Sequence, residues 1–344
     1  MAQDWVRAGE ERFGLSCQAT LAAQKAREQL RDQVALLAVA GAERILRKDA
    51  STPVQHMYAT SFGLSGKFLD EFRSFWTLPP EWVIDENELA KGLEYFRLGA
   101  ASISQNGRFL AYSTDTNGSE RYTARIKDLQ TGELLPDMLE NLRGDLVWVA
   151  GDTALVYGPS TEEWRTLEAK LHVIGTPVES DVTLYKEEDQ SFSVGTGLSA
   201  QEDWLIIATG DNETSEVRLV PAANPTAEPI LVKARKKGVE YSVDVRDGEL
   251  WVWTNDDHIN FRLAKAKLDA PGEWQTVIPG SDDFYLTGFD LFKGFFVTEG
   301  RLNGLDQIQL RQYGDPAKVT PISFPEPSFT AGLSNNPEYD MQVL

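Results

Sequence analysis

The sequence contains one cysteine, Cys17, among its 344 residues. A single cysteine excludes an intramolecular disulfide and a zinc site built from several thiolates. Positive charge is also scarce, because 33 lysine and arginine residues stand against 53 aspartate and glutamate residues, for a net charge of −20. Nucleic acid and anionic membranes would repel such a chain, so neither is an expected partner. The acidity agrees with a basic partner, although many soluble proteins are equally acidic.

Long apolar runs are missing as well. The longest, Val34–Ala42, is far shorter than the roughly 20 residues that a membrane-spanning helix needs. The first residues, MAQDWVRAGEERFG, lack the basic start and apolar run of a signal peptide. Without a secretion signal, the glycosylation sequons at Asn117 and Asn212 carry little weight. The expected location is therefore the cytoplasm.

The chain has two compositional regimes. Residues 1–53 form the first regime, an expected N-terminal helical segment. Within it, Ala19–Lys48 has no proline. Residues spaced three or four apart would lie on one face of a helix there: Leu30, Val34, Leu37, Gly41 and Ile45. From about residue 100, short alternating runs rich in Val, Ile, Tyr, Trp and Thr predict β-strands. Residues 54–99 diverge from both patterns and are expected to form at most a partial first blade.

Residues 102–133 show how the strands are organised. Phe109–Ser113 is a largely apolar run, as expected for a strand packed between sheets. Asn117-Gly118 predicts a tight hairpin turn with positive φ angles. The next strand alternates apolar and polar residues from Tyr122 to Lys127 and ends near a turn at Gly132. The pattern predicts a meander of antiparallel strands.

The same meander recurs four more times. Successive units start at Gly107, Gly151, Glu202, Gly248 and Lys293, which lie 44, 51, 46 and 45 residues apart. A period near 45 residues with four strands per unit is typical of a β-propeller. We therefore predict an all-β fold, a propeller of the seven-bladed type that is incomplete and preceded by an N-terminal helical segment.

In this interpretation residues 100–344 form the blades and the last blade is truncated. A tandem of immunoglobulin-like sandwiches, the alternative fold, would not easily give so regular a period. Aromatic side chains bury a large area, so six tryptophans are expected between blades: Trp148, Trp164, Trp204, Trp251, Trp253 and Trp274.

The letters of residues 84–340 resemble the prolyl oligopeptidase family, in particular its oligopeptidase B branch. The opening blade contains FRLGAASISQNGRFLAYSTDTNGSERYTARIKDLQTGE, and later blades contain IGTPVESDVTLYKEEDQSFSVG, TNDDHINFRL and FTAGLSNNPEYD, each similar to family segments. The resemblance implies a propeller that covers the active site of a serine peptidase. It also implies short peptide substrates cut after Arg or Lys, hence short basic peptides as partners once a hydrolase domain is supplied.

Two departures from the family limit this inference. Residues 55–80 do not follow the family pattern, and residue 344 falls where such enzymes finish the propeller and enter an α/β-hydrolase domain. The resemblance places the Ser-Asp-His triad in that domain. No catalytic residue is therefore expected in this chain, which we predict to be inactive by itself.

A direct search for catalytic motifs agrees with this expectation. A hydrolase serine of this kind needs the motif G-x-S-x-G, and the nearest match is GLSG at residues 63–66, which we interpret as a loop around Ser65. The three histidines, His56, His172 and His258, have no supporting pattern. No phosphate-binding loop or cofactor motif is present, so no cofactor is expected.

Three polar clusters invite a binding role but have simpler interpretations. Asp256, Asp257 and His258 could hold a metal only if adjacent side chains converged, so a solvated hairpin tip is favoured and no metal is expected. Residues 211–216, DNETSE, are interpreted in the same way. The basic residues are expected to lie in an exposed turn between blades rather than in an anion site: Lys233, Arg235, Lys236 and Lys237.

Two further hypotheses for the function remain open. The chain could be a stand-alone propeller that binds a partner at its face or its central channel. It could instead be a truncated relic whose open last blade leaves unpaired strand edges. A partner chain, if one binds, is expected at the open face of the propeller.

Overall fold

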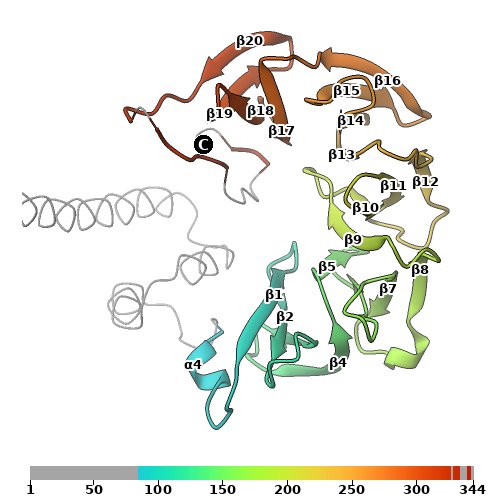
Figure 1. Ribbon diagram of the computed structural model, residues 1–344. Helices are drawn as coiled ribbons and strands as arrows, with labels where there is room; N and C mark the ends of the chain where they lie inside the picture. The colour runs from blue at the N-terminus through green and yellow to red at the C-terminus, as the bar shows by residue number, and fades with distance from the viewer. Residues whose placement is uncertain (1–83, 327, 334–338, 342–344) are drawn as a thin grey trace, which may run out of the picture. The chain divides into compact units, whose positions relative to one another are not determined.

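The computed structural model describes residues 84–326, 328–333 and 339–341 (Figure 1). All of them belong to the second of two compact units, Asp70–Leu344. The helix expected within residues 1–53 lies outside the described residues, as do residues 54–83 of the divergent segment. Two short helices occur in the described part, α4 (Glu86–Leu89) and the 3-10 helix η3 (Val178–Ser180).

The described residues are otherwise β-structure, in five antiparallel sheets of four strands each. The first sheet contains β1 (Arg97–Ile103), β2 (Phe109–Asp115), β3 (Tyr122–Asp128) and β4 (Leu134–Leu142). The second contains β5 (Val147–Val149), β6 (Ala154–Tyr157), β7 (Glu168–Val173) and β8 (Val182–Lys186). The third contains β9 (Ser193–Leu198), β10 (Trp204–Gly210), β11 (Ser215–Pro221) and β12 (Ile230–Lys233).

The last two sheets repeat this order. The fourth contains β13 (Tyr241–Arg246), β14 (Glu249–Thr254), β15 (Arg262–Lys267) and β16 (Ala270–Ile278). The fifth contains β17 (Phe284–Leu291), β18 (Phe296–Leu302), β19 (Leu305–Gln312) and β20 (Asp315–Pro321). Each strand pairs with the next one in the chain, so every sheet is a simple meander. The predicted five units are confirmed.

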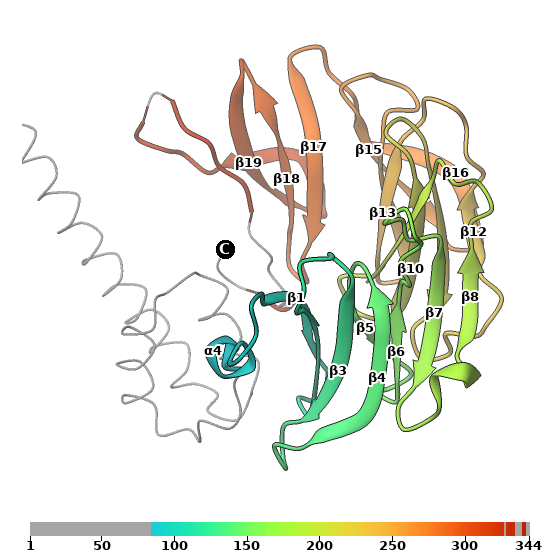
Figure 2. The same ribbon diagram turned by 60° about the horizontal axis from the view of Figure 1, so that its bottom comes forward.

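The sheets follow one another in chain order. First strands lie near first strands, since β5 contacts both β1 and β9, and fourth strands lie near fourth strands, since β16 contacts both β12 and β20. Figure 1 shows β5, β9, β13 and β17 on the inner side of the sheets and β8, β12, β16 and β20 on the outer side. In Figure 2 the strands are seen along their length. This is the arrangement of propeller blades, and the predicted fold class is confirmed.

Apolar layers between consecutive sheets hold the blades together. Ile126 of the first sheet packs with Leu155 of the second, and Val156 of the second packs with Ile207 of the third. Leu219 and Val252 join the third and fourth sheets. A blade alone would leave both of its apolar faces in water, so each sheet depends on its neighbours.

Most of the tryptophans occupy these junctions. The Trp148 indole N–H donates to the carbonyl of Ser102 in the first sheet (3.0 Å), and the Trp253 indole N–H donates to Leu286 in the fifth (2.9 Å). Trp251 packs on Phe296 of the next sheet, with ring centroids 5.1 Å apart. The expected packing between blades is confirmed at these positions, whereas Trp164 is 49% exposed.

The second strands are the most buried because both of their faces are covered by neighbouring sheets. In β14, Leu250, Trp251 and Val252 are consecutive and all buried. In third strands, buried and exposed residues alternate instead. In β3, for example, Ala124 and Ile126 are buried and Arg125 is exposed. The expected alternation of this strand is confirmed.

The turn between β2 and β3 differs from the prediction. Gly118 has φ of 77°, but the other positive φ belongs to Glu120 at 56°, and none is found at Asn117. The Asp115 carboxylate accepts the N–H groups of Asn117, Gly118 and Glu120 at 2.8–3.0 Å. A side chain therefore organises a longer loop, and the predicted two-residue turn was wrong.

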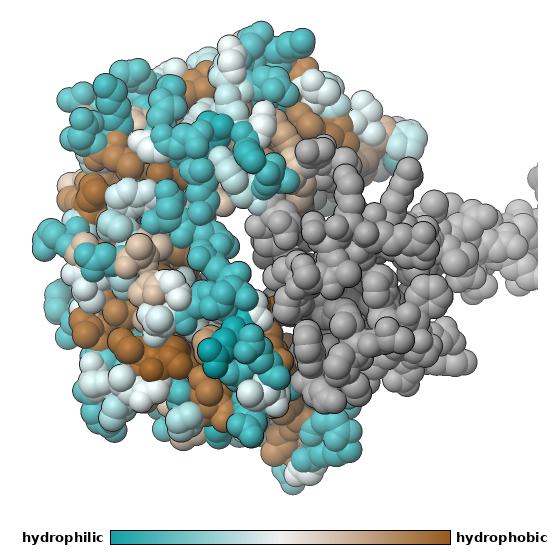
Figure 3. Space-filling model, turned by 180° about the vertical axis from the view of Figure 1, so that it is seen from behind, coloured by the Kyte–Doolittle hydropathy of each residue, from teal (hydrophilic) through white to brown (hydrophobic). Residues whose placement is uncertain are grey.

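The surface in Figure 3 is largely hydrophilic, with apolar patches separated by polar residues. Among the described residues no helix is both long and apolar enough to cross a membrane.

Candidate functional site

Each sheet has a turn that joins its first and second strands, and these first turns contact one another. In the first sheet, the backbone N–H groups of Gln105 and Asn106 donate to the two carboxylate oxygens of Asp152 in the second sheet, at 3.0 and 2.8 Å. Asp152 is buried, and these two donors satisfy both of its carboxylate oxygens. The first turns of the two sheets are thereby tied together at one end.

The third, fourth and fifth sheets are tied in the same way. Gln201 exchanges two hydrogen bonds with Asp247, of 3.1 Å from its amide nitrogen and 2.7 Å to its amide oxygen. Arg246 then donates to the carbonyl of Lys293 in the fifth sheet (3.0 Å). We call this series of linked turns, which runs from Gln105 to Lys293, the first-turn belt.

One bond in the belt connects two sheets that are not consecutive. The side-chain amide of Gln105 donates to the Glu202 carboxylate at 2.7 Å, which connects the first sheet to the third. Both side chains are exposed. This bond draws the first turns of sheets one, two and three together, where the inner strands end.

Acidic groups accompany the belt on the first strands of the fourth and fifth sheets. Asp244 of β13 accepts the backbone N–H groups of Ala200 (2.8 Å) and Val245 (2.7 Å). Burial raises the pKa of Asp244 to about 7, and the charge of Asp290 adds to the shift, while the two N–H groups oppose it. Burial and the charge of Glu299 also raise the pKa of Asp290, on β17. Asp244 and Asp290 therefore lose their protons at a higher pH than an ordinary aspartate does.

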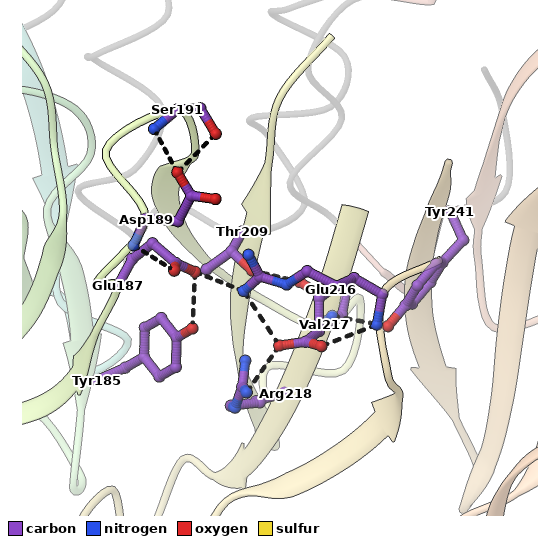
Figure 4. A network of polar contacts seen from close by, with 10 residues as sticks. Tyr185, Glu187, Asp189, Ser191, Thr209, Glu216, Val217, Arg218 and Tyr241 are labelled. Carbon is purple, nitrogen blue, oxygen red and sulfur yellow. Dashed lines mark hydrogen bonds and ion pairs between the residues drawn. The ribbon is translucent and has the colours of Figure 1, made fainter. Parts of the chain in front are cut away.

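A second polar network joins the second and third sheets (Figure 4). The Arg235 guanidinium, just after β12, contacts Glu187 at 2.5 Å and Glu216 at 3.3 Å. Its backbone N–H also donates to Glu216 (2.9 Å), and Arg218 contacts Glu216 at 2.7 Å. Glu187 follows β8 and Glu216 lies on β11, so Arg235 bridges two blades.

The network keeps both glutamates ionised despite their burial. Burial alone would raise the pKa of Glu187 and Glu216, but hydrogen bonds from Arg235 and from backbone N–H groups hold both values below the usual range. The arginines also stack on aromatic rings, Arg218 over Tyr185 at 4.3 Å and Arg235 over Phe192 at 4.1 Å. All of these contacts are internal, which indicates a structural joint.

A fully buried histidine joins the first and second sheets. His172 of β7 contacts Asp137 of β4 through Nε2 (2.9 Å) and Asp181 through Nδ1 (2.7 Å). The Tyr157 hydroxyl donates to Asp181 at 2.8 Å, and the backbone N–H of Gly175 donates to Asp137 at 2.5 Å. Each ring nitrogen thus faces a carboxylate oxygen, which fixes the imidazole between the two sheets. Because the cluster is closed to solvent, it has no access for a substrate.

The possible metal ligands Asp256 and His258, which are close in the sequence, make separate contacts in the structure. Asp256 pairs with Arg262 at 2.8 Å, while His258 contacts the exposed Asp282 at 3.3 Å and the backbone N–H of Asn260. Asp256 and His258 therefore do not converge, and no group of His, Cys, Asp and Glu among the described residues could hold a metal. His56 and the loop around Ser65 lie outside the described residues.

The predictions for residues 211–216 and for the basic cluster at residues 233–237 had different outcomes. Asp211 caps its own hairpin by accepting the N–H groups of Glu213 and Thr214, as expected of a solvated tip. The exposed basic turn was correct for Lys236 and Lys237. It was wrong for Lys233, which lies on β12 with its ammonium 3.7 Å from the Trp274 ring, and for Arg235, which the two glutamates hold between blades. The carboxylates that bind Arg235 lie 48 and 19 residues earlier in the chain, so no local pattern reveals them.

Residues 69–343 match the family described as prolyl oligopeptidase, N-terminal beta-propeller domain. The chain belongs to this family. Within the described residues of this prolyl oligopeptidase propeller, the histidines bond to carboxylates and to a backbone N–H, not to a serine.

Known relatives of this propeller are peptidases. Dipeptidyl aminopeptidase BI of Pseudoxanthomonas mexicana is 36% identical over 261 residues, which cover 74% of this chain and 36% of the relative. Protease 2 of Moraxella lacunata is 29% identical and is covered to 38%. The chain thus spans little more than a third of the length of these relatives.

Solved structures agree. Oligopeptidase B from Trypanosoma brucei, with covalently bound antipain in its closed form, superimposes with a TM-score of 0.71 and 30% identity, over 75% of this chain and 38% of that one. Oligopeptidase B from Leishmania major gives a TM-score of 0.72 at 26% identity, with the same coverage. The resemblance found in the sequence is confirmed at the level of the family and of its oligopeptidase B-like members.

Proposed function

We propose that this chain is the propeller part of an oligopeptidase B-like serine peptidase, where it admits short peptides to a hydrolase domain that the described residues do not contain. The observation that carries the proposal is the family match over residues 69–343, together with similarity to oligopeptidase B structures. The first-turn belt agrees with it, because it fixes the turns at one end of the inner strands. A narrow opening would favour extended peptides over folded proteins.

We further propose that the substrates are cleaved after Arg or Lys. Support comes from the oligopeptidase B-like sequence and from the acidic balance of the chain, with 53 acidic against 33 basic residues. An excess of carboxylates raises the local concentration of cationic peptides. A cytoplasmic location also stays a proposal, supported by the near absence of cysteine.

The first experiment tests whether the chain is inactive alone. The purified chain is incubated with an arginyl fluorogenic peptide and, separately, with a fluorophosphonate that labels active-site serines. No turnover and no labelling are expected. Turnover accompanied by labelling of this chain would show that it contains its own catalytic serine.

The second experiment tests the role in a peptidase. The chain is co-expressed with the separately encoded hydrolase domain of oligopeptidase B from Trypanosoma brucei. Co-purification of the two and cleavage of arginyl but not glutamyl peptides are expected. A hydrolase domain that neither binds this chain nor changes its activity in its presence would contradict the proposal.

A further inference from the structure

The chain contains three Asn-Gly dipeptides: Asn106-Gly107, Asn117-Gly118 and Asn303-Gly304. In such a pair the side-chain carbonyl of asparagine is open to attack by the next backbone nitrogen, because glycine has no side chain to shield that nitrogen. All three asparagines are exposed. The three pairs therefore share the same reacting groups and differ only in what surrounds them.

The loop between β2 and β3 places a base beside the nitrogen of Gly118. The Gly118 N–H donates to Oδ1 of Asp115 at 2.9 Å, a distance over which a general base can accept a proton. Burial alone would raise the pKa of Asp115, but hydrogen bonds from backbone N–H groups of the loop hold it below its usual value. Asp115 is therefore a carboxylate at neutral pH and can take up this proton.

The same loop places a hydrogen-bond donor on the side-chain oxygen of Asn117. The Ser119 N–H donates to Asn117 Oδ1 at 3.0 Å. A donor at this distance stabilises the negative charge that develops on a carbonyl oxygen when a nucleophile adds to its carbon. Asn117 thus has an activated carbonyl carbon, and the adjacent nitrogen of Gly118 has a base for its proton. The two groups belong to neighbouring residues, so ring closure gives a five-membered imide.

The other two dipeptides lack this combination. Asn106 Oδ1 also accepts a backbone N–H, that of Arg108, at 2.9 Å. The Gly107 N–H, however, donates to the backbone carbonyl of Ser104 (2.8 Å), which is not a base at neutral pH. Asn303-Gly304 lies in the turn between β18 and β19, where no carboxylate among the described residues accepts the glycine N–H. Asn106 therefore differs from Asn117 chiefly in lacking the base.

We propose that Asn117 is a self-modification site, at which Asp115 and the Ser119 N–H promote closure of the asparagine side chain onto the Gly118 nitrogen. The Asp115 carboxylate takes the proton from this nitrogen, and the nitrogen bonds to Asn117 Cγ. The Cγ–Nδ2 bond then breaks, Nδ2 keeps the electron pair and takes the proton back from Asp115, and ammonia leaves. Water opens the cyclic imide at either carbonyl and gives aspartate or isoaspartate. The inference does not depend on the proposed peptidase role.

Isoaspartate at position 117 would weaken a joint between the first and second sheets. It adds one carbon to the backbone just before Gly118, so the loop that Asp115 organises must rearrange. Two residues beyond Asn117, the Ser119 carbonyl accepts the Trp164 indole N–H at 2.9 Å. This bond ties the loop after β2 to the loop after β6. The modification therefore acts on the contact between two blades and not only on a surface loop.

Conversion rates at the three sites test the proposal. The full chain is incubated at neutral pH in heavy-oxygen water, and mass spectrometry of digests counts labelled aspartate and isoaspartate at Asn106, Asn117 and Asn303. In the native chain Asn117 should convert at least tenfold faster than Asn106, a small effect for a general base. In unfolding concentrations of urea the three rates should converge and that of Asn117 should fall. Conversion of Asn117 that is no faster in the native chain than in urea overturns the proposal.

Two further measurements test Asp115 as the base. Asp115→Asn should slow conversion of Asn117 at least tenfold, whereas Glu120→Gln, which removes an exposed charge from the same loop, should leave it unchanged. In the native chain the rate at Asn117 should be nearly constant from pH 6 to pH 8, because Asp115 stays ionised. The rate at Asn106 should instead rise with hydroxide concentration. An equally steep rise at Asn117, or an unchanged rate in Asp115→Asn, would show that Asp115 is not the base and would overturn its role.

Discussion

At the scale of single residues, two carboxyl groups on neighbouring first strands are held against ionisation. Burial raises the pKa of Asp244 to about 7, and burial also raises the pKa of Asp290. In the unfolded chain an aspartate titrates near its ordinary value of about 4. The folded state therefore binds a proton between these limits that the unfolded state releases.

The first prediction concerns this proton. Because the folded pKa of Asp244 is raised, its contribution to stability is full at about pH 4 and is lost as the pH rises to about 7. Asp244→Asn should remove this slope and stabilise the protein at pH 8 by roughly 1–2 kcal/mol, a figure reduced for partial solvent exposure. Urea unfolding at pH 4, 6 and 8 measures it. Parallel pH profiles for the two proteins would contradict it.

The buried His172 gives a second prediction. Replacing one member of a buried hydrogen-bonded cluster leaves the others unpaired, at a cost of about 3 kcal/mol. His172→Gln should therefore lower the free energy of unfolding by about that amount. Glu162→Gln, at an exposed position between β6 and β7, is the control and should change it by less than about 0.5 kcal/mol. Equal effects of the two substitutions in urea unfolding would refute the importance of the cluster.

Sequence patterns could not identify these residues for a physical reason. His172 bonds to carboxylates 35 residues before and 9 residues after it, and only the docking of one sheet on another brings them together. Local patterns record burial and turns, not which distant side chains meet. The interpretation of Asp256 to His258 as a hairpin tip was right about the location between β14 and β15, which needs only local rules, but Asp256 is paired with Arg262 and is not solvated.

At the scale of strands and turns, the joints between sheets combine apolar layers with a few polar bridges. Apolar and β-branched runs made the strands predictable from the sequence, and the 45-residue period made their order predictable. The loop after β2 was not, because Asp115 accepts three backbone N–H groups and lengthens the turn. A side chain that replaces backbone hydrogen bonds changes a turn without changing the surrounding pattern.

The third prediction tests the bridge between the second and third sheets. Arg235→Ala removes the cation shared by Glu187 and Glu216 and should destabilise the protein by about 2 kcal/mol. Lys236→Ala, one residue away and exposed, should change stability by less than about 0.5 kcal/mol. Thermal or urea unfolding of both variants decides the matter. A loss for Lys236→Ala as large as that for Arg235→Ala would mean that charge alone, not the bridge, is responsible.

At the scale of the whole molecule, the excess of negative charge opposes the compact state. With a net charge of −20, the excess carboxylates repel one another. Salt screens this repulsion, with a Debye length of about 10 Å at 0.1 M. Raising sodium chloride from about 20 mM to about 0.5 M should therefore raise the melting temperature by several degrees. Calorimetry measures it. A melting temperature that falls with salt would show that local ion pairs outweigh the global repulsion.

The fold at this scale was predictable because repetition is a global pattern. The units starting at Gly107, Gly151, Glu202, Gly248 and Lys293 correspond to the five sheets. A seven-bladed ring and a domain boundary near residue 100 remain predictions. What the period could not reveal is the first-turn belt, since the bonding partners are polar residues that look like ordinary turn residues in every unit.

The belt also has an evolutionary consequence. Its links between consecutive sheets join residues 46–47 positions apart, which is about the length of one unit. A tandem duplication of one unit within the gene would therefore keep the spacing between consecutive first turns at both new junctions. The bond from Gln105 to Glu202 spans 97 positions and would be broken by a unit inserted between the first and third sheets. Insertion of a whole unit beyond the third sheet would leave this bond intact, whereas insertion between the first and third sheets would break it.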